Sequence, residues 1–195
     1  MKILITGGTG FVGERLINKL RSTGHQLRVI SRNSIPGIET VVADLKEASI
    51  PSEALSGVDT VFHLAGIAHD FREAAKMRNI YYAINVDSTI QLAELAIQSD
   101  VKRFVFVSSV KAGGKAFSSK CMIETDQFEP EGIYGKSKRK AEIMLLELSH
   151  QSDMHIVIVR PSLVYGPGMK GNLKLMLSGI QKGWFPPLPN IDNHQ

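Results

Sequence analysis

The chain has one cysteine among 195 residues, and no apolar run in it is long enough to cross a membrane. Cys121 therefore has no partner for an internal disulfide, which fits a reducing compartment. The apolar run at 3–5 is short and leads into glycines, so it is neither a signal peptide nor a membrane span. These absences lead us to expect a cytoplasmic protein without a membrane span.

The chain also lacks a strong excess of one charge sign, because 23 basic and 19 acidic residues give a net charge of only +4. That excess is too small to indicate a nucleic-acid partner, although it suits anionic small molecules. The basic cluster at 136–140 is typical of a solvated helix face, Lys138 excepted. His63, His69 and Asp70 match no known metal-ligand spacing, so we expect no metal site.

Short apolar runs alternate with amphipathic segments along the chain. The runs predict strands at 2–6, 27–31, 40–43, 60–64, 103–108 and 155–160. Patterns with helical period predict helices at 11–22, 83–98, 133–149 and 173–181. Continuously apolar strands are buried on both faces, and their alternation with helices is typical of parallel sheets. We expect an α/β protein with a doubly wound parallel sheet, the Rossmann fold.

The composition changes near residue 165. Five of the chain's eight prolines follow Arg160, at positions 161, 167, 186, 187 and 189. This favours a Rossmann domain over 1–165 and the beginning of a smaller subdomain over 166–195. The sequence stops in what we predict to be a loop, so we expect a chain that lacks most of that subdomain.

Three glycines join the first predicted strand to the first helix. Gly7, Gly10 and Gly13 are spaced G-x-x-G-x-x-G in TGGTGFVG. The first glycine permits a tight turn, the second lets a phosphate approach the backbone, and the third lets helix and strand pack closely. Free N–H groups at the helix start would then face a pyrophosphate. The strand, turn and helix context predicts a dinucleotide site.

A second pattern has the residue types of an acid–base site. Tyr134 and Lys138 lie four residues apart at a helix start, and Ser109 ends the fifth predicted strand. A cation beside a phenol lowers its pKa, so we expect Lys138 to make Tyr134 a usable proton carrier. Ser109 would hydrogen-bond the reacting oxygen. Each match alone occurs by chance, but their order behind a glycine loop favours catalysis.

These motifs, with several others in the same order, resemble the NAD-dependent epimerase/dehydratase family. The others are DL at 44–45, HLAG at 63–66, NV at 85–86, VSS at 107–109, YGKSK at 134–138 and RPSLVYGPG at 160–168. The family is an extended short-chain dehydrogenase/reductase group, and the resemblance to its UDP-glucose 4-epimerase-like members covers essentially the whole chain. It implies that the subdomain at 166–195 binds substrate.

The resemblance also implies roles for individual residues. Ser109, Tyr134 and Lys138 would be catalytic, while Ser109 and Asn172 would meet the substrate, Asn172 at its diphosphate. The implied cofactor-binding residues, which also include Tyr134 and Lys138, are Gly7, Gly10, Phe11, Val12, Gly13, Ser31, Arg32, Asp44, Leu45, Leu64, Ala65, Gly66, Asn85, Val107 and Pro161. Asp44 and Leu45 would contact the adenine, and Asn85 would support the active site or Lys138.

Two departures from the family pattern fall on the substrate side. Ala112-Gly113-Gly114 replaces the usual V-Y-G after the serine, and Leu163 stands where the family often has Asn. The sugar is therefore less certain from sequence than the cofactor.

The cofactor itself is NAD or NADP. NAD enzymes of this fold usually have an acid at the end of the second strand, where it accepts hydrogen bonds from the ribose hydroxyls. Here that strand ends at Ser31 and is followed by Arg32 and Asn33, and the next acid is Glu39. Arg32 can pair with a 2′-phosphate or stack on the adenine, so NADP is favoured without excluding NAD.

The sequence thus predicts an NAD(P)-dependent epimerase/dehydratase-type enzyme acting on a UDP-linked sugar. An NADPH-dependent reductase of a 4-keto sugar nucleotide is an alternative. A catalytically silent nucleotide-binding protein is another, which an intact Ser–Tyr–Lys set argues against. The resemblance also leaves a homodimer open.

Overall fold

A computed structural model describes residues 1–47, 50–68, 74–114, 123–126, 128–130, 132–169 and 172–184. Cys121, His69 and Asp70 lie outside these residues, as does most of the proline-rich tail. Among the described residues, no helix is long and apolar enough to span a membrane.

Six strands form one sheet in which every neighbouring pair is parallel. They are β1 (Lys2–Thr6), β2 (Gln26–Ser31), β3 (Glu39–Val42), β4 (Thr60–His63), β5 (Arg103–Val107) and β6 (His155–Val159). Their order is β3-β2-β1-β4-β5-β6, which confirms the predicted doubly wound sheet. The chain reverses its direction across the sheet between β1 and β4, and the carboxyl ends of the strands at such a point form a crevice for ligands.

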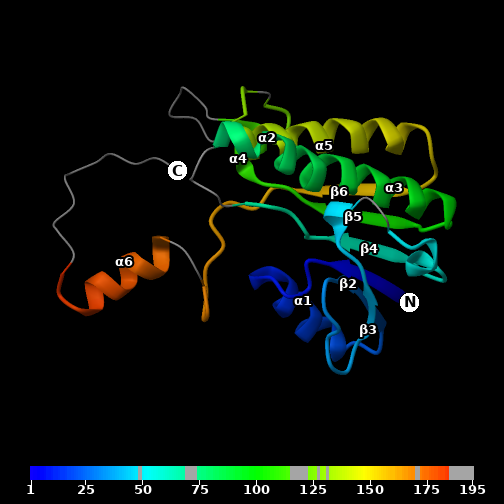
Figure 1. Ribbon diagram of the computed structural model, residues 1–195, viewed down its shortest axis with the longest axis horizontal. Helices are drawn as coiled ribbons and strands as arrows, with labels where there is room; N and C mark the ends of the chain where they lie inside the picture. The colour runs from blue at the N-terminus through cyan, green and yellow to red at the C-terminus, as the bar shows by residue number, and fades with distance from the viewer. Residues whose placement is uncertain are drawn as a thin grey trace.

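Helices cover both faces of this sheet (Figure 1). They are α1 (Phe11–Arg21), α2 (Ala74–Tyr82), the π-helix η3 (Ala83–Asp87), α3 (Ser88–Gln98), α4 (Val110–Gly113), α5 (Gly132–His150) and α6 (Asn172–Gln181). Two short 3₁₀ turns, η1 (Leu45–Glu47) and η2 (Ser52–Leu55), connect β3 to β4. The predicted helix at 83–98 is confirmed from residue 88 onward, but its first turn is a π-helix that continues α2, which the sequence did not predict.

Alternating side chains of the central strands divide the core into two clusters. Leu4, Val61 and Phe104 pack under α3 and α5, while Ile3 and Ile5 pack under α1. Because α1 covers only its own part of the second face, the prediction that all strands are buried on both faces is wrong for β6. Val157 and Val159 of this edge strand are 36% and 43% exposed, and the prediction is also wrong for β3 at the other edge, where Val42 is 61% exposed.

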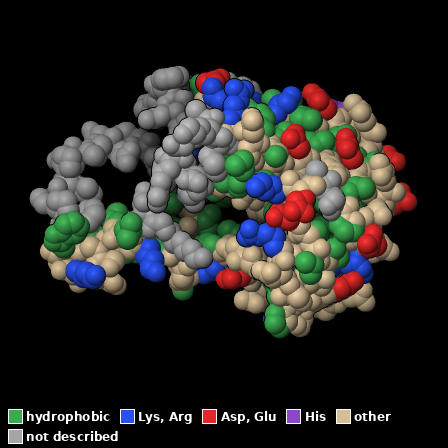
Figure 2. All heavy atoms as spheres, viewed as in Figure 1, with side chains coloured by type: hydrophobic (Ala, Val, Ile, Leu, Met, Phe, Trp, Pro, Cys, Tyr) green, Lys and Arg blue, Asp and Glu red, His purple; other side chains and the backbone are tan. Residues whose placement is uncertain are grey.

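Helix α6 stands apart from the sheet, at the left of Figure 1. Hydrophobic side chains gather on the same segment in Figure 2. Leu175, Leu177, Ile180 and the nearby Trp184 are all exposed there. The predicted helix at 173–181 is therefore confirmed, whereas the division into two subdomains stays a prediction.

Candidate functional site

The glycine loop has the geometry that its spacing predicts. Gly7 has a φ of 70°, and a Cβ there would lie 2.7 Å from the backbone nitrogen of Ala65 in the loop after β4. A Cβ on Gly13 would overlap the carbonyl oxygen of Gly7. A side chain on Gly7 would therefore collide with the loop after β4, and one on Gly13 would push α1 away from the end of β1, which confirms the tight turn and the close packing.

Gly10 faces outward at the start of α1. It is the N-cap residue, and no side chain caps the helix there. A Cβ built on Gly10 would meet only the Gly7 carbonyl oxygen, at 3.2 Å. Phe11 and Val12 open the first turn behind it. The N–H groups of this turn are thus available to an anion, and a dinucleotide pyrophosphate fits the position.

Ser109 and Tyr134 come together although 25 positions separate them in the sequence. Ser109 follows β5 by two residues and caps α4, where its hydroxyl accepts a hydrogen bond from the Lys111 N–H. A Cβ on Gly135 would lie 2.5 Å from the Lys111 carbonyl oxygen, so α5 presses against α4. This contact sets Tyr134 beside Ser109, and the Ser109 side chain acts on the Tyr134 hydroxyl and lowers its pKa.

Lys138 reaches the same edge from the next turn of α5. It is only 3% exposed, and its ammonium donates a hydrogen bond of 3.0 Å to the carbonyl oxygen of Val107, the last residue of β5. The ring of Phe106 lies 4.5 Å from the Lys138 nitrogen, a favourable cation–π distance.

Burial dominates the acid–base properties of both groups. It raises the pKa of Tyr134, Ser109 opposes that rise, and Tyr81 adds to it. It also lowers the pKa of Lys138 to about 8, while Glu142 opposes that change. The expectation that Lys138 lowers the pKa of Tyr134 is therefore wrong for the protein alone, because desolvation outweighs the other contributions.

Asn85 fixes the loop after β4 to α5. Its side-chain oxygen accepts from the Ile67 N–H at 2.9 Å, and its nitrogen donates to the Ile67 carbonyl at 3.1 Å and to the Ser137 hydroxyl at 3.0 Å. A Cβ on Gly66 would approach both Asn85 and Lys138. The π-helix around Asn85 is a distortion often found at functional sites. Asn85 thus connects the loop after β4 to the turn of α5 that carries Lys138, and its role in the site stays a prediction.

His63 forms a buried network that the sequence did not predict. Thr89 donates its hydroxyl proton to the Asn85 carbonyl, so its oxygen accepts from Nε2 of His63 at 2.8 Å. Nδ1 of His63 then accepts from the Thr6 hydroxyl at 2.7 Å, and Thr6 accepts from the Ala65 N–H. This tautomer satisfies each group with a neutral ring. Burial, with a contribution from Lys138, lowers the pKa of His63 to about 3.

The other predicted residues lie along the same sheet edge. Leu64 and Ala65 follow β4, Pro161 follows β6, and the N–H of Val110 donates to the Pro161 carbonyl. Near the other end of the edge, Ser31 ends β2, with Arg32 next to it, and Asp44 and Leu45 follow β3. Asn172 is the first residue of α6, but its side chain lies outside the described part of the structure.

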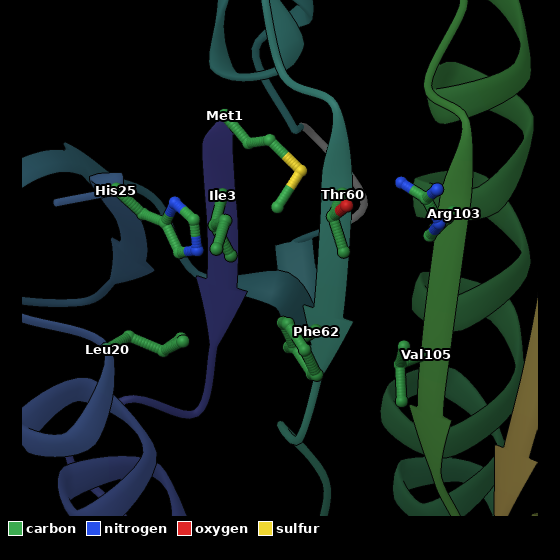
Figure 3. A pocket seen from close by; sticks show the side chains of 8 residues that line it. All are labelled: Met1, Ile3, Leu20, His25, Thr60, Phe62, Arg103 and Val105. Atoms are coloured by element: carbon green, nitrogen blue, oxygen red, sulfur yellow. The ribbon is translucent and has the colours of Figure 1, made fainter. Parts of the chain in front are cut away.

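A pocket of about 340 Å³ lies elsewhere, on the α1 face near the amino ends of the strands. Figure 3 shows its lining side chains, which include Ile3, Thr60 and Arg103 at or near the starts of β1, β4 and β5. It is therefore separate from the carboxyl edge, where a parallel sheet binds its ligands.

Tyr81 is one of the features that sequence patterns did not reveal. It is 4% exposed on α2 and acts electrostatically on Tyr134. The segment that replaces V-Y-G is buried, and Gly114 has a φ of 81° with no room for a Cβ beside Glu129. No sequence motif or spacing marks the burial of Tyr81 or the packing of Gly114.

A family model described as the NAD dependent epimerase/dehydratase family matches residues 3–184. A UDP-glucose 4-epimerase of Vibrio cholerae is 37% identical over 99% of this chain and 61% of its own length. A 3 beta-hydroxysteroid dehydrogenase/Delta 5-->4-isomerase of Mycobacterium tuberculosis is 30% identical over 93% of this chain and 52% of its own length.

Among solved structures, MoeE5 in complex with UDP-glucose and NAD has a TM-score of 0.83 and 28% identity. That alignment covers 94% of this chain and 62% of MoeE5. The chain thus spans between about half and three fifths of the length of these proteins, with values from 52% to 62%.

The neutral, buried state of His63 predicts a loss of stability in acid. Its pKa is 6.5 in a free chain and about 3 in the folded protein, so between these values only the unfolded chain binds the proton. Stability therefore rises with pH across this window and is lost on acidification, by about 1.4 kcal/mol per pH unit. His63→Gln should flatten that slope, as measured by urea unfolding from pH 7 to 3. His150→Gln, at an exposed position on α5, should leave it unchanged, and an equal slope in both variants would contradict the network.

Proposed function

The chain belongs to the NAD-dependent epimerase/dehydratase family, and from this membership we propose that it is the dinucleotide-binding part of an enzyme that transfers hydride at a carbon of a nucleotide-linked sugar. In this proposal the enzyme is UDP-glucose 4-epimerase-like. Ser109, Tyr134 and Lys138 are its catalytic residues, and the loop from Gly7 to Gly13 binds the cofactor.

One observation carries the proposal. Tyr134 lies beside Ser109, which acts on its hydroxyl, and buried Lys138 lies one turn further along the same helix. All three lie at the sheet edge that carries the open N-terminus of α1. This arrangement supports a proton carrier and an anion site along one sheet edge, as transfer between a dinucleotide and a second ligand requires.

A nicotinamide dinucleotide, when bound, would supply the group that takes or gives hydride. The Tyr134 hydroxyl would move the proton of the substrate oxygen, and Ser109 would orient that oxygen by a hydrogen bond. The Lys138 ammonium would stabilise the phenolate and reach the nicotinamide ribose. The N–H groups at the start of α1 would hold the pyrophosphate.

A UDP-sugar is the substrate class that we propose. The Vibrio cholerae relative is a UDP-glucose 4-epimerase by name, and MoeE5 was solved with UDP-glucose and NAD. The net charge of +4 suits an anionic diphosphate, and we assign Asn172 to that group. In the complete protein, calorimetry with UDP and UDP-sugars tests the assignment, and no binding of any of them would overturn it.

A reductase of a 4-keto sugar nucleotide is a second candidate. Arg32 follows β2 directly and is exposed, and within the described residues it forms no ion pair. A free guanidinium at this strand end suits the 2′-phosphate of NADP, and cells keep NADPH mainly for reductions. The chain's similarity to a steroid dehydrogenase agrees with plain oxidoreductase chemistry in relatives.

Gly10→Val should abolish or strongly weaken dinucleotide binding. The valine side chain would point from the helix start into the space where the pyrophosphate approaches, where a Cβ meets the Gly7 carbonyl oxygen at 3.2 Å. Fluorescence titration of this chain with NAD(H) and NADP(H) measures the effect. Gly24→Ala, in the exposed turn before β2, is a control that should bind as the wild type does. Equal affinities in all three proteins would refute the assignment of the loop.

Tyr134→Phe should reduce turnover at least about a hundredfold in the complete protein while leaving cofactor affinity unchanged. It removes only the hydroxyl that moves the proton. Turnover with NAD(P) and UDP-sugars is the measurement, and Tyr82→Phe, on α2 and outside the motifs, is its control. If the wild-type protein binds cofactor but converts no sugar nucleotide, the catalytically silent reading replaces the enzyme.

Arg32→Ala should weaken NADP(H) binding about tenfold and leave NAD(H) binding nearly unchanged, because only NADP has a phosphate for the guanidinium to contact. We expect the wild type to bind NADP(H) at least as well as NAD(H). Calorimetric titration of both cofactors gives the ratio. A clear preference for NAD(H) that Arg32→Ala does not alter would favour the epimerase over the reductase.

A further inference from the structure

A buried carboxylate lies one turn beyond Lys138 on α5. Glu142 is 1% exposed, and Arg160 binds it through two hydrogen bonds, from Nε at 2.9 Å and from a terminal nitrogen at 2.6 Å. Arg139 approaches the same carboxylate at 3.5 Å. Residues four apart share one face of a helix, so the Glu142 charge is close to the Lys138 side chain. Neither the proton transfer nor the cofactor binding proposed for this chain involves Glu142.

Lys138 meets few other charged or titratable groups. On α5 its neighbours are Tyr134 and Glu142, and on β4 its neighbour is His63, which is neutral near pH 7. The groups from β5 and the π-helix, the Val107 carbonyl, the Phe106 ring and the Asn85 amide, carry no net charge. Glu142 is thus the anion among the described residues that opposes the effect of burial on Lys138.

The partner of Glu142 stands next to the proposed site. Arg160 directly precedes Pro161, whose carbonyl accepts from the Val110 N–H, and the preceding Val159 carbonyl accepts from the Ser108 N–H. These two bonds flank Ser109. The Glu142–Arg160 pair therefore connects the helix that carries Tyr134 and Lys138 to the segment that fixes Ser109.

We propose that Glu142 is a positioning residue whose carboxylate keeps the Lys138 ammonium charged near neutral pH and, through Arg160, holds the Ser109 segment against α5. The assignment of a role to this charge rests on the proposed function. The coupling between Glu142 and Lys138 is a property of the folded chain and can be measured without substrate or cofactor.

The test is the free energy of unfolding of this chain as a function of pH, from 6 to 10.5. The pKa of Lys138 is about 8 in the folded protein and 10.5 in a free chain, so the unfolded state holds more protons between these values. The contribution of Lys138 to the free energy of unfolding therefore rises with pH above about 8. Glu142→Gln should start that rise about one pH unit lower, as expected for the loss of a nearby opposite charge. The difference from wild type should narrow at alkaline pH.

Three further proteins make the result specific. Glu147→Gln removes the same charge from an exposed position on α5 and should leave the profile unchanged. Adding Lys138→Met should make the effect of Glu142→Gln independent of pH. Glu142→Asp keeps the charge and should keep the rise near pH 8, even if shorter reach lowers stability. A pH-independent difference in the presence of Lys138, or a full-unit shift in Glu142→Asp, would overturn the proposal.

A pH–rate profile of the complete protein then separates the two proposals. The alkaline limb of kcat should move down by about one unit in Glu142→Gln and not in Glu147→Gln. If the unfolding profiles show the coupling but no sugar nucleotide is converted, the coupling stands and the proposed function fails. If turnover occurs but the unfolding profiles show no coupling, the role of Glu142 fails alone.

Discussion

The burial of one ammonium group constrains most of the proposed site. Lys138 is 3% exposed, and an unpaired charge in such a place would be costly. Its surroundings reduce that cost with a carbonyl oxygen at the end of β5, an aromatic face and the carboxylate of Glu142. The Lys138 side chain also needs a glycine beside it, because a Cβ on Gly66 would lie 3.2 Å from the Lys138 nitrogen. The glycine after β4, the aromatic strand β5 and the acid on α5 are in this sense consequences of a single buried cation.

The sheet topology brings these groups together from distant parts of the sequence. Parallel strands end at one edge, so the loops after β1, β4, β5 and β6 meet there. Hydrogen bonds then fix the loops to one another. Thr6 accepts from the Ala65 N–H, and His63 connects Thr6 to Thr89 on α3. Asn85 connects the next residues of the β4 loop to α5. Such links hold a site to a defined geometry, which acid–base chemistry needs.

The strands and the glycine loop could be predicted because each depends on neighbours in sequence. The apolar runs predicted the six strands of the sheet, and Gly7 and Gly13 have the packing roles that their spacing indicates. Tyr134 and Lys138 were found for the same reason. Helix α2 was missed because no apolar period marks it, the π form of the predicted helical turn at 83–87 was missed because an apolar period does not distinguish it from an α-helix, and β6 was misjudged because its sequence cannot show that it lies at an edge. The contacts of His63 and the Glu142–Arg160 pair join residues 18 to 57 positions apart, which only the fold brings together.

The pKa values of Tyr134 and Lys138 bear on the direction of the proposed chemistry. With the pKa of Tyr134 raised and that of Lys138 lowered to about 8, rising pH removes the proton from Lys138 before it removes the one from Tyr134. At neutral pH the folded chain therefore holds a protonated phenol, the state of a proton donor. Reduction of a ketone needs such a donor, whereas oxidation of an alcohol needs a phenolate. A further positive charge near the phenol would favour that phenolate. Glu142 acts on the other member of the pair, since by keeping Lys138 charged it preserves a cation one helical turn from Tyr134.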